Sequence, residues 1–231
     1  MSLRPEYKTY NFAGHDEHVL CFGAEYSRQI LIIPPLFDEM NRCRRMLVQA
    51  MRGLAERNVG SLLIDLPGCN ESLAALEQQS LTTWREAVSA AASQLGATHI
   101  ASLRGGVLID GGAIDLPHWR LAPAKGSSLL KTMIRTRIAG DKEAGKATSE
   151  VELMGAAKTA SIELAGNLLG PAMVAELASA EPAEVAKLTL RTLGQDIAGS
   201  TLWLRPEPQD DPTMSAAIAA DLDQWSASCG G

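Results

Sequence analysis

The chain has 231 residues, of which 46% are hydrophobic and 21% charged, a balance that is typical of a globular domain and excludes a disordered chain. Its formal net charge of −6 argues against a general nucleic-acid-binding protein. No apolar run approaches the roughly 18 residues that a membrane-spanning helix needs, and the polar N-terminus does not have the form of a signal peptide.

The first half of the chain alternates predicted strands and helices. Gln29–Ile33 is a continuous apolar run, as expected of a strand buried on both faces, and residues 39–57 then carry apolar side chains three or four positions apart, as in an amphipathic helix. A second apolar run follows, and this strand–helix–strand order predicts parallel strands. The predicted strands are 10–12, 19–22, Gln29–Ile33, 61–66, His99–Leu103, 119–122 and 201–204, and the predicted helices of this part are 39–57 and 82–95.

Residues 124–194 differ from the rest because they hold no strand-like run and begin with a basic stretch. We expect an α/β core made of residues 1–123 and 195–231, with residues 124–194 inserted into it as a helical cap. The chain is expected to return to the sheet before it ends in one more amphipathic helix that includes Leu222 and Trp225. The helices predicted in the cap are 129–138, 162–169, 171–177 and 182–190.

Residues 102–106 form the most informative motif of the chain. A short predicted strand runs into a tight turn flanked by small residues and then into a helix, which is the pattern of a nucleophile elbow, where a strained turn raises one side chain above the sheet. Arg104 holds the place of the nucleophile, and a guanidinium group cannot attack a carbonyl carbon. The other interpretation is an ordinary strand-turn-helix junction with a solvated arginine.

Three blocks of the sequence resemble a known family. Residues 34–46 read PPLFDEMNRCRRM, residues 63–69 read LIDLPGC, and residues 102–106 read SLRGG. They are similar to the PP-F-x-E-E-M-N-x-S-R-R-M, D-L-P-G-C-G-D-S and G-L-R-x-G blocks of the exosortase A system-associated hydrolases, which are α/β-hydrolase-fold proteins. Cys43 and Asn70 stand where that family has a serine and a glycine.

This resemblance implies an α/β-hydrolase fold, a mostly parallel sheet flanked by helices with an inserted helical cap, in bacteria that make an exported polysaccharide. It does not by itself prove hydrolysis. A hydrolase triad places its histidine after the nucleophile and the acid, whereas every histidine of this chain precedes the cap. The ordinary Ser-His-Asp triad is therefore missing, and loss of a single triad residue already costs several powers of ten in rate. The histidines are His15, His18, His99 and His118.

Cys69 and Asp65 are the candidates for any remaining catalytic role, because they lie at the end of a predicted strand, at the edge where such folds place their sites. A thiol there can act as a nucleophile, but no histidine is placed to activate it, so we favour an inert buried cysteine. For Asp65 we favour a structural hydrogen bond.

The candidate ligand-binding residues surround Arg104. The turn after the first buried strand is where hydrolases place an oxyanion-hole N–H. A buried guanidinium needs a negative partner, and we expect Glu39, or else Asp38, to form a bidentate pair with Arg104. The alternative partner is a carboxylate or phosphate of a ligand. The candidates are Leu36, Phe37, Glu39, Arg104 and Gly105.

Three functions are compatible with these residues. The leading hypothesis is a non-catalytic or strongly altered hydrolase homologue that binds a small anionic or acyl-bearing ligand, or a protein partner, beneath the cap. The second is an ester or thioester hydrolase that uses Cys69 or an acid-activated water, and the third is an interaction scaffold whose basic cap docks an acidic partner. The cysteines form no CxxC pair, so we expect no zinc site or disulfide framework, but reduced thiols in a cytoplasmic protein. No GxGxxG or P-loop motif follows a predicted strand, and no HExxH or paired-histidine spacing occurs, so we expect no cofactor and no metal.

Overall fold

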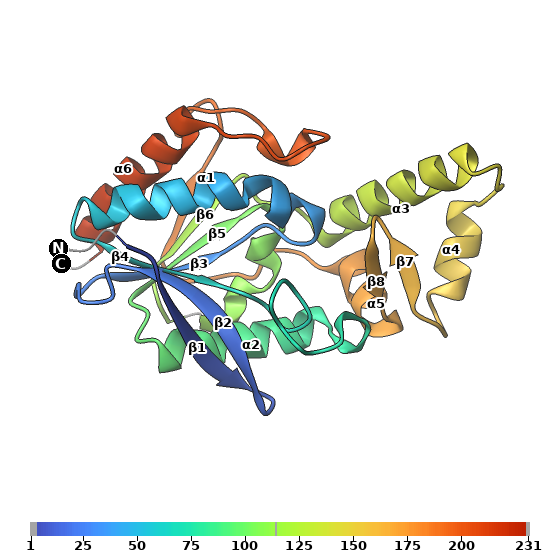
Figure 1. Ribbon diagram of the computed structural model, residues 1–231, viewed down its shortest axis with the longest axis horizontal. Helices are drawn as coiled ribbons and strands as arrows, with labels where there is room; N and C mark the ends of the chain where they lie inside the picture. The colour runs from blue at the N-terminus through green and yellow to red at the C-terminus, as the bar shows by residue number, and fades with distance from the viewer. Residues whose placement is uncertain (1–3, 114, 230–231) are drawn as a thin grey trace.

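The computed structural model describes residues 4–113 and 115–229. Within these residues, seven strands form one sheet in the order β1-β2-β4-β3-β5-β6-β9 (Figure 1). β1 and β2 form an antiparallel hairpin, β2 is antiparallel to β4, and the remaining neighbours are parallel, which confirms the predicted mostly parallel sheet. The strands are β1 (Glu6–Phe12), β2 (His15–Phe22), β3 (Gln29–Ile33), β4 (Gly60–Ile64), β5 (His99–Leu103), β6 (His118–Leu121) and β9 (Leu188–Arg191).

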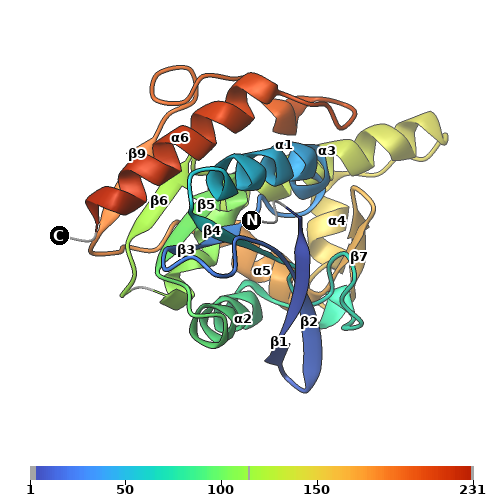
Figure 2. The ribbon, with the colours of Figure 1, turned by 60° about the vertical axis from the view of Figure 1, so that its left-hand side comes forward.

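The central strands send alternate side chains into two apolar cores, one on each face of the sheet. In β3, Leu31 belongs to one core and Ile32 to the other, and both are buried. α2 (Leu81–Gln94) covers the first face, and α1 (Asp38–Ala55) and α6 (Pro212–Ser228) cover the second (Figure 2). Burial on both sides explains why these strands read as unbroken apolar runs. None of the described helices is both long enough and apolar enough to cross a membrane.

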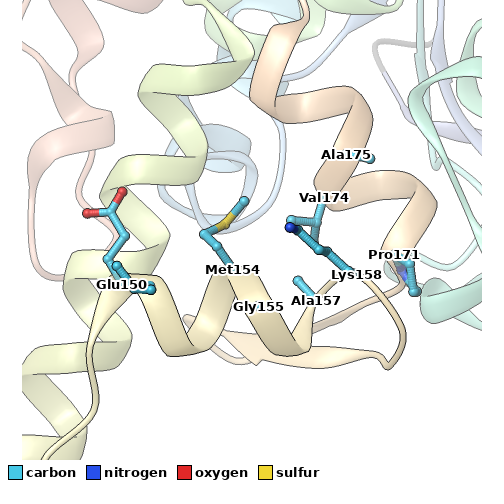
Figure 3. Close-up of a pocket in the computed structure, with 9 residues that line it drawn as sticks. Glu150, Met154, Gly155, Ala157, Lys158, Pro171, Val174 and Ala175 are labelled. Carbon is cyan, nitrogen blue, oxygen red and sulfur yellow. The ribbon is translucent and has the colours of Figure 1, made fainter.

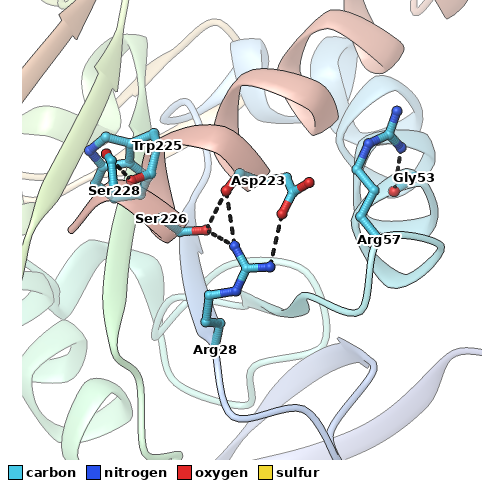
Figure 4. A network of polar contacts seen from close by, with 7 residues as sticks. All are labelled: Arg28, Gly53, Arg57, Asp223, Trp225, Ser226 and Ser228. Atoms are coloured by element: carbon cyan, nitrogen blue, oxygen red, sulfur yellow. Dashed lines mark hydrogen bonds and ion pairs between the residues drawn. The ribbon is translucent and has the colours of Figure 1, made fainter. Parts of the chain in front are cut away.

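Arg28, just before β3, fastens the last helix to the core. Its Nη1 donates to Asp223 O at 2.9 Å and to Ser226 Oγ at 3.0 Å, and its Nη2 donates to Asp223 Oδ1 at 2.9 Å (Figure 4). On the same helix, Asp221 Oδ2 accepts a hydrogen bond from Trp119 Nε1 at 2.6 Å. These contacts join residues that are far apart in the sequence and hold α6 against the sheet.

Between β6 and β9 the chain leaves the sheet and forms a lobe, residues 126–179, which we call the insert (Figure 1). A helix predicted over residues 162–169 is wrong, because two short antiparallel strands form a hairpin there. Ala165 and Gly166 at its turn have φ of 49° and 76°, the left-handed conformation that two-residue hairpin turns require. The elements of the insert are α3 (Gly126–Glu143), α4 (Glu150–Ala156), β7 (Ile162–Leu164), β8 (Asn167–Leu169) and α5 (Pro171–Ser179).

Two further sequence predictions are wrong. Residues 182–190, predicted to be helical, contain the start of β9, which pairs in parallel with β6. Residues 201–204, predicted as a strand, instead hold a 3-10 turn, η4 (Leu202–Leu204), whose buried side chains pack into the core on the α1 side. Segments this short carry too few apolar residues to distinguish a strand from a helix by spacing alone.

Candidate functional site

The turn after β5 is strained at Arg104, as the elbow interpretation requires. Arg104 has a φ of 52°, a left-handed conformation that is uncommon for residues other than glycine. Gly106 has no room for a side chain, because a Cβ there would lie 2.6 Å from Pro34 O in the turn after β3. The chain then continues as a 3-10 helix, η2 (Arg104–Leu108). The geometry favours the elbow interpretation over a plain junction with a solvated arginine.

The Arg104 guanidinium forms a bidentate ion pair with Glu39 in the first turn of α1. Nε and Nη2 each donate to one carboxylate oxygen at 3.1 Å, and Nη1 donates to Ala122 O at 3.3 Å. The side chains of Arg104 and Glu39 are 19% and 12% exposed, so the pair is largely shielded from water. The expected internal pair is therefore confirmed. β3 and β5 are neighbours in the sheet, and the residues that follow them meet at one edge.

Trp203 adds a contact that the sequence does not predict. Arg104 Cζ lies 4.8 Å from the centre of the Trp203 ring, within the range of a cation–π contact. Arg42 Nη1 donates to Trp203 O at 3.1 Å and so holds this residue against α1. Because Trp203 lies in the segment wrongly predicted as a strand, its sequence position gave no reason to place it beside Arg104.

Three residues around the guanidinium have left-handed backbones although none is a glycine. Besides Arg104, these are Phe37, with φ of 56°, and Ala122, with φ of 47°. Such conformations cost of order 1 kcal/mol or more each and persist where the surrounding structure imposes them, often at binding sites. Three of the seven non-glycine residues with positive φ in the described part of the chain thus lie at the edge of the sheet where the ion pair is.

Glu39 is the partner of the pair whose pKa is shifted. Burial raises the pKa of its carboxyl group, and the hydrogen bonds and charge of Arg104, together with Arg42, only partly oppose this effect. Glu39 therefore takes up a proton more readily than an ordinary glutamate as the pH falls. Once protonated, it no longer neutralises Arg104, whose guanidinium remains charged.

A cavity of about 80 Å³ lies against the ion pair, between the elbow and α3 of the insert. A space of this size accepts a small polar group such as a carboxylate or phosphate. Gly105, the fifth predicted residue, is not part of the cavity lining. It packs closely against α3, where a Cβ at Gly105 would be 2.5 Å from Leu129 Cδ1. Four of the five predicted ligand-binding residues do meet here: Leu36, Phe37, Glu39 and Arg104.

No protein-family model and no curated protein matches the chain, whereas solved structures do. The putative hydrolase from Agrobacterium vitis S4 is 14% identical, with a TM-score of 0.52 over 82% of this chain and 78% of that one. The chain has an α/β-hydrolase fold. Epoxide hydrolase from Vigna radiata (14% identity, TM-score 0.42) is covered over 38% of its length by 51% of this chain. Haloalkane dehalogenase DatA from Agrobacterium tumefaciens C58 (15% identity, TM-score 0.42) is covered over 41% by 52% of this chain, so less than half of either enzyme is spanned.

This α/β-hydrolase fold keeps its histidines away from the elbow. His99 begins β5, whereas Arg104 follows the end of the same strand, so about 16 Å of extended chain separates them. His118 likewise begins β6, and His15 and His18 lie in β2. None of the four lines the cavity beside Arg104. The elbow therefore has no histidine beside it.

Restoring a hydroxyl at the elbow is expected to leave the protein unreactive. In Arg104→Ser, the serine would occupy the nucleophile position with no histidine to take its proton, so labelling by a fluorophosphonate probe should stay near background. Mass spectrometry of the intact protein after incubation with the probe measures this. Rapid stoichiometric labelling of Ser at position 104 would show that another group acts as the base.

The two candidate catalytic residues lie in a different polar cluster. Asp65 Oδ1 accepts hydrogen bonds from Asn70 Nδ2 at 2.6 Å and from Arg44 Nη1 at 3.2 Å. Burial raises the pKa of the Cys69 thiol to about 12, with further increases from the charges of Asp65 and Glu17, so the thiolate needed for attack is scarce at neutral pH. In the described part of the chain, no three His, Cys, Asp or Glu side chains converge to share a metal ion.

A larger hollow, of about 840 Å³, lies on the insert between α4 and α5 (Figure 3). Met154 and Val174 give it apolar walls, Lys158 extends along it, and the space at Gly155 is open, with no atom within 4 Å of a Cβ built there. It shares no lining residue with the cavity at the elbow. Apolar spacing in the sequence did not reveal it, because α4 has only seven residues.

Proposed function

We propose that the protein is a non-catalytic α/β-hydrolase homologue that binds a small anionic or acyl-bearing ligand at the elbow. Arg104 is the binding residue, in the place of a nucleophile. The observation that carries this proposal is the ion pair of Arg104 with Glu39 on the wall of the cavity beneath the insert. A carboxylate or phosphate group can accept the same two hydrogen bonds as the Glu39 carboxylate and replace it.

Exchange of Glu39 for a ligand anion links binding to a proton. Two carboxylates cannot both pair fully with one guanidinium, and the displaced Glu39 would remain a buried anion unless it takes up a proton. Its raised pKa favours that uptake. Anion binding should therefore strengthen as the pH falls toward the pKa of Glu39 and weaken as the pH rises.

The resemblance to the exosortase A system-associated hydrolases supports a proposal for the kind of cell in which this function is carried out. We place the protein in the cytoplasm of bacteria that make an exported polysaccharide, with the insert, residues 126–179, as a cap over the ligand site. Gly105 packs against Leu129 of α3, so the insert lies directly over the elbow. Hydrolysis by Cys69 is the less favoured function, because its buried thiol has a raised pKa and no histidine partner.

Calorimetric titration with butyrate at pH 5.5 and 7.5 tests the proposal. The wild-type protein should bind more tightly at pH 5.5 and take up protons, which buffers of different ionisation enthalpy reveal. Glu39→Gln should bind more tightly at pH 7.5 and lose the pH dependence. Arg104→Gln should weaken binding by about tenfold or more, because it removes a charge-assisted pair of hydrogen bonds.

Arg135→Gln is the matched control, since Arg135 is exposed on α3 and does not line the cavity. It removes the same charge and should leave butyrate binding unchanged. Equal weakening by Arg135→Gln and Arg104→Gln would mean that only the overall charge matters. If Arg104→Gln bound butyrate as tightly as the wild type, Arg104 would not be part of the binding site.

A further inference from the structure

Glu17 on β2 is a buried carboxylate without a positive partner. Only 1% of its surface is exposed. Its Oε1 accepts a hydrogen bond from Ser72 Oγ at 3.0 Å, whereas its Oε2 accepts none from the described residues. None of the ion pairs among those residues involves Glu17. A carboxylate in this position is costly to bury unless a positive group pairs with it.

The neighbours of Glu17 add negative charge and do not neutralise it. Asp65 lies nearby, directly after β4, but its own charge is paired with Arg44. Besides burial, the charges of Asp65 and Glu17 both raise the pKa of the Cys69 thiol, which places all three groups in one region. Tyr10 donates its hydroxyl hydrogen to Asp65 O at 2.9 Å and not to Glu17. Among the described residues, Glu17 is therefore the carboxyl group of this cluster that has no positive partner.

Glu17 lies in the wall of a hollow of about 450 Å³, which separates the β1–β2 hairpin from the segment after β4. This volume falls within the range of small-molecule pockets. Phe12 and Leu73 supply apolar surface, and Gln78 and Thr83 supply side-chain oxygens. Glu17 is the single carboxylate among the described lining residues, which include one histidine, His15, and no lysine or arginine.

We propose that this hollow binds a small primary amine, whose ammonium group pairs with Glu17 Oε2 and whose apolar body lies against Phe12 and Leu73. An ammonium group has three donors and a full positive charge, which suits a carboxylate oxygen together with neighbouring amide and hydroxyl oxygens. A divalent metal ion is less suited, because it needs several oxygen ligands and Glu17 is the single acid of the lining. The site is separate from the elbow and does not depend on the function proposed for it.

Two variants of β2 test this proposal at equal charge. Glu17→Gln removes the buried charge with little change of shape. Asp16→Asn is the matched control, because Asp16 is the adjacent residue of the same strand but is exposed and bonded to Asn11 Nδ2 at 3.0 Å. The probe is n-propylammonium chloride, with 1-propanol as the neutral analogue of the same shape and KCl at matched ionic strength.

Melting temperature and calorimetric binding are measured for the wild type and both variants. Propylammonium should raise the melting temperature of the wild type and of Asp16→Asn with a saturable dependence on concentration, since a ligand of the folded state stabilises it. Neither 1-propanol nor KCl should do so. Glu17→Gln should remain folded and bind propylammonium about ten- to a hundredfold more weakly, the range expected on losing a hydrogen bond to a charged group.

Equal stabilisation of Glu17→Gln and the wild type by propylammonium would overturn the proposal, as would stabilisation by 1-propanol to the same extent. Absence of any propylammonium effect on a folded wild type would overturn it too, and would indicate that Glu17 is a buried acid with a purely structural role.

Discussion

Arg120→Met is expected to reduce the free energy of unfolding by about 3–5 kcal/mol, the cost of leaving a buried charge without its partner. Arg120 Nε and Nη2 each donate to one oxygen of Asp110 at 2.7 Å, and Nη2 also donates to Ala183 O at 2.8 Å. The Asp110 side chain is fully buried and that of Arg120 is 3% exposed. Urea denaturation followed by circular dichroism measures the loss.

The double variant Arg120→Met/Asp110→Leu should recover much of that stability, because both charges are gone and apolar groups fill the space. Lys125→Met is the matched control: Lys125 and Glu181 pair at 2.9 Å but are 62% and 57% exposed, so its loss should change little. If Arg120→Met were no more destabilising than Lys125→Met, the buried pair would contribute nothing to stability.

Arg104→Met should lower the free energy of unfolding by about 2–4 kcal/mol, less than Arg120→Met because the pair at the elbow is partly exposed. The variant leaves Glu39 as a shielded carboxylate and also removes the contact with the Trp203 ring. Arg104→Met/Glu39→Met should regain most of the loss. If the double variant had the same loss in free energy of unfolding as Arg104→Met, the cause would be the methionine side chain at position 104 and not the unpaired Glu39 carboxylate.

The deficit of Arg104→Met should shrink as the pH falls from 7 to 5. The folded-state pKa of Glu39 is already raised, so its contribution to stability is greatest below the unfolded-state pKa of about 4.3 and is lost as the pH rises through the folded-state value. Without Arg104 that pKa should rise further, and protonation then removes the unpaired charge. Parallel urea titrations across this range measure the trend, and a deficit that grows toward pH 5 would contradict it.

Several features of the site follow from local sequence patterns. The strand Gln29–Ile33 is an unbroken apolar run because both of its faces are covered, and its bounds match the prediction. The elbow could be located because small residues around Arg104 permit a strained turn and a close approach to the turn after β3. The ion pair of Arg104 with Glu39 could also be predicted, since residues that follow two adjacent parallel strands meet at one edge of the sheet.

Short elements and long-range contacts could not be predicted from local sequence patterns. β9 has four residues, and its place beside β6 depends on hydrogen bonds between strands that are distant in the sequence, such as His118 N–H to Lys187 O at 2.8 Å. The hairpin of the insert turns at Ala165 and Gly166, where an alanine in a left-handed conformation is not signalled by residue type. Packing against the rest of the molecule decides such segments, because their own residues favour helix and strand about equally.

The sequence by itself determined the parallel core, the elbow and the presence of an arginine where a nucleophile is expected. Only the tertiary structure decided what surrounds that arginine: Trp203 at 4.8 Å, and a cavity of about 80 Å³. The tertiary structure also showed that Glu17 is buried and that its Oε2 has no hydrogen-bond partner among the described residues. The physical reason is that the spacing of apolar residues along the chain reflects local conformation. Burial and charge pairing depend instead on groups that come together only when distant segments pack.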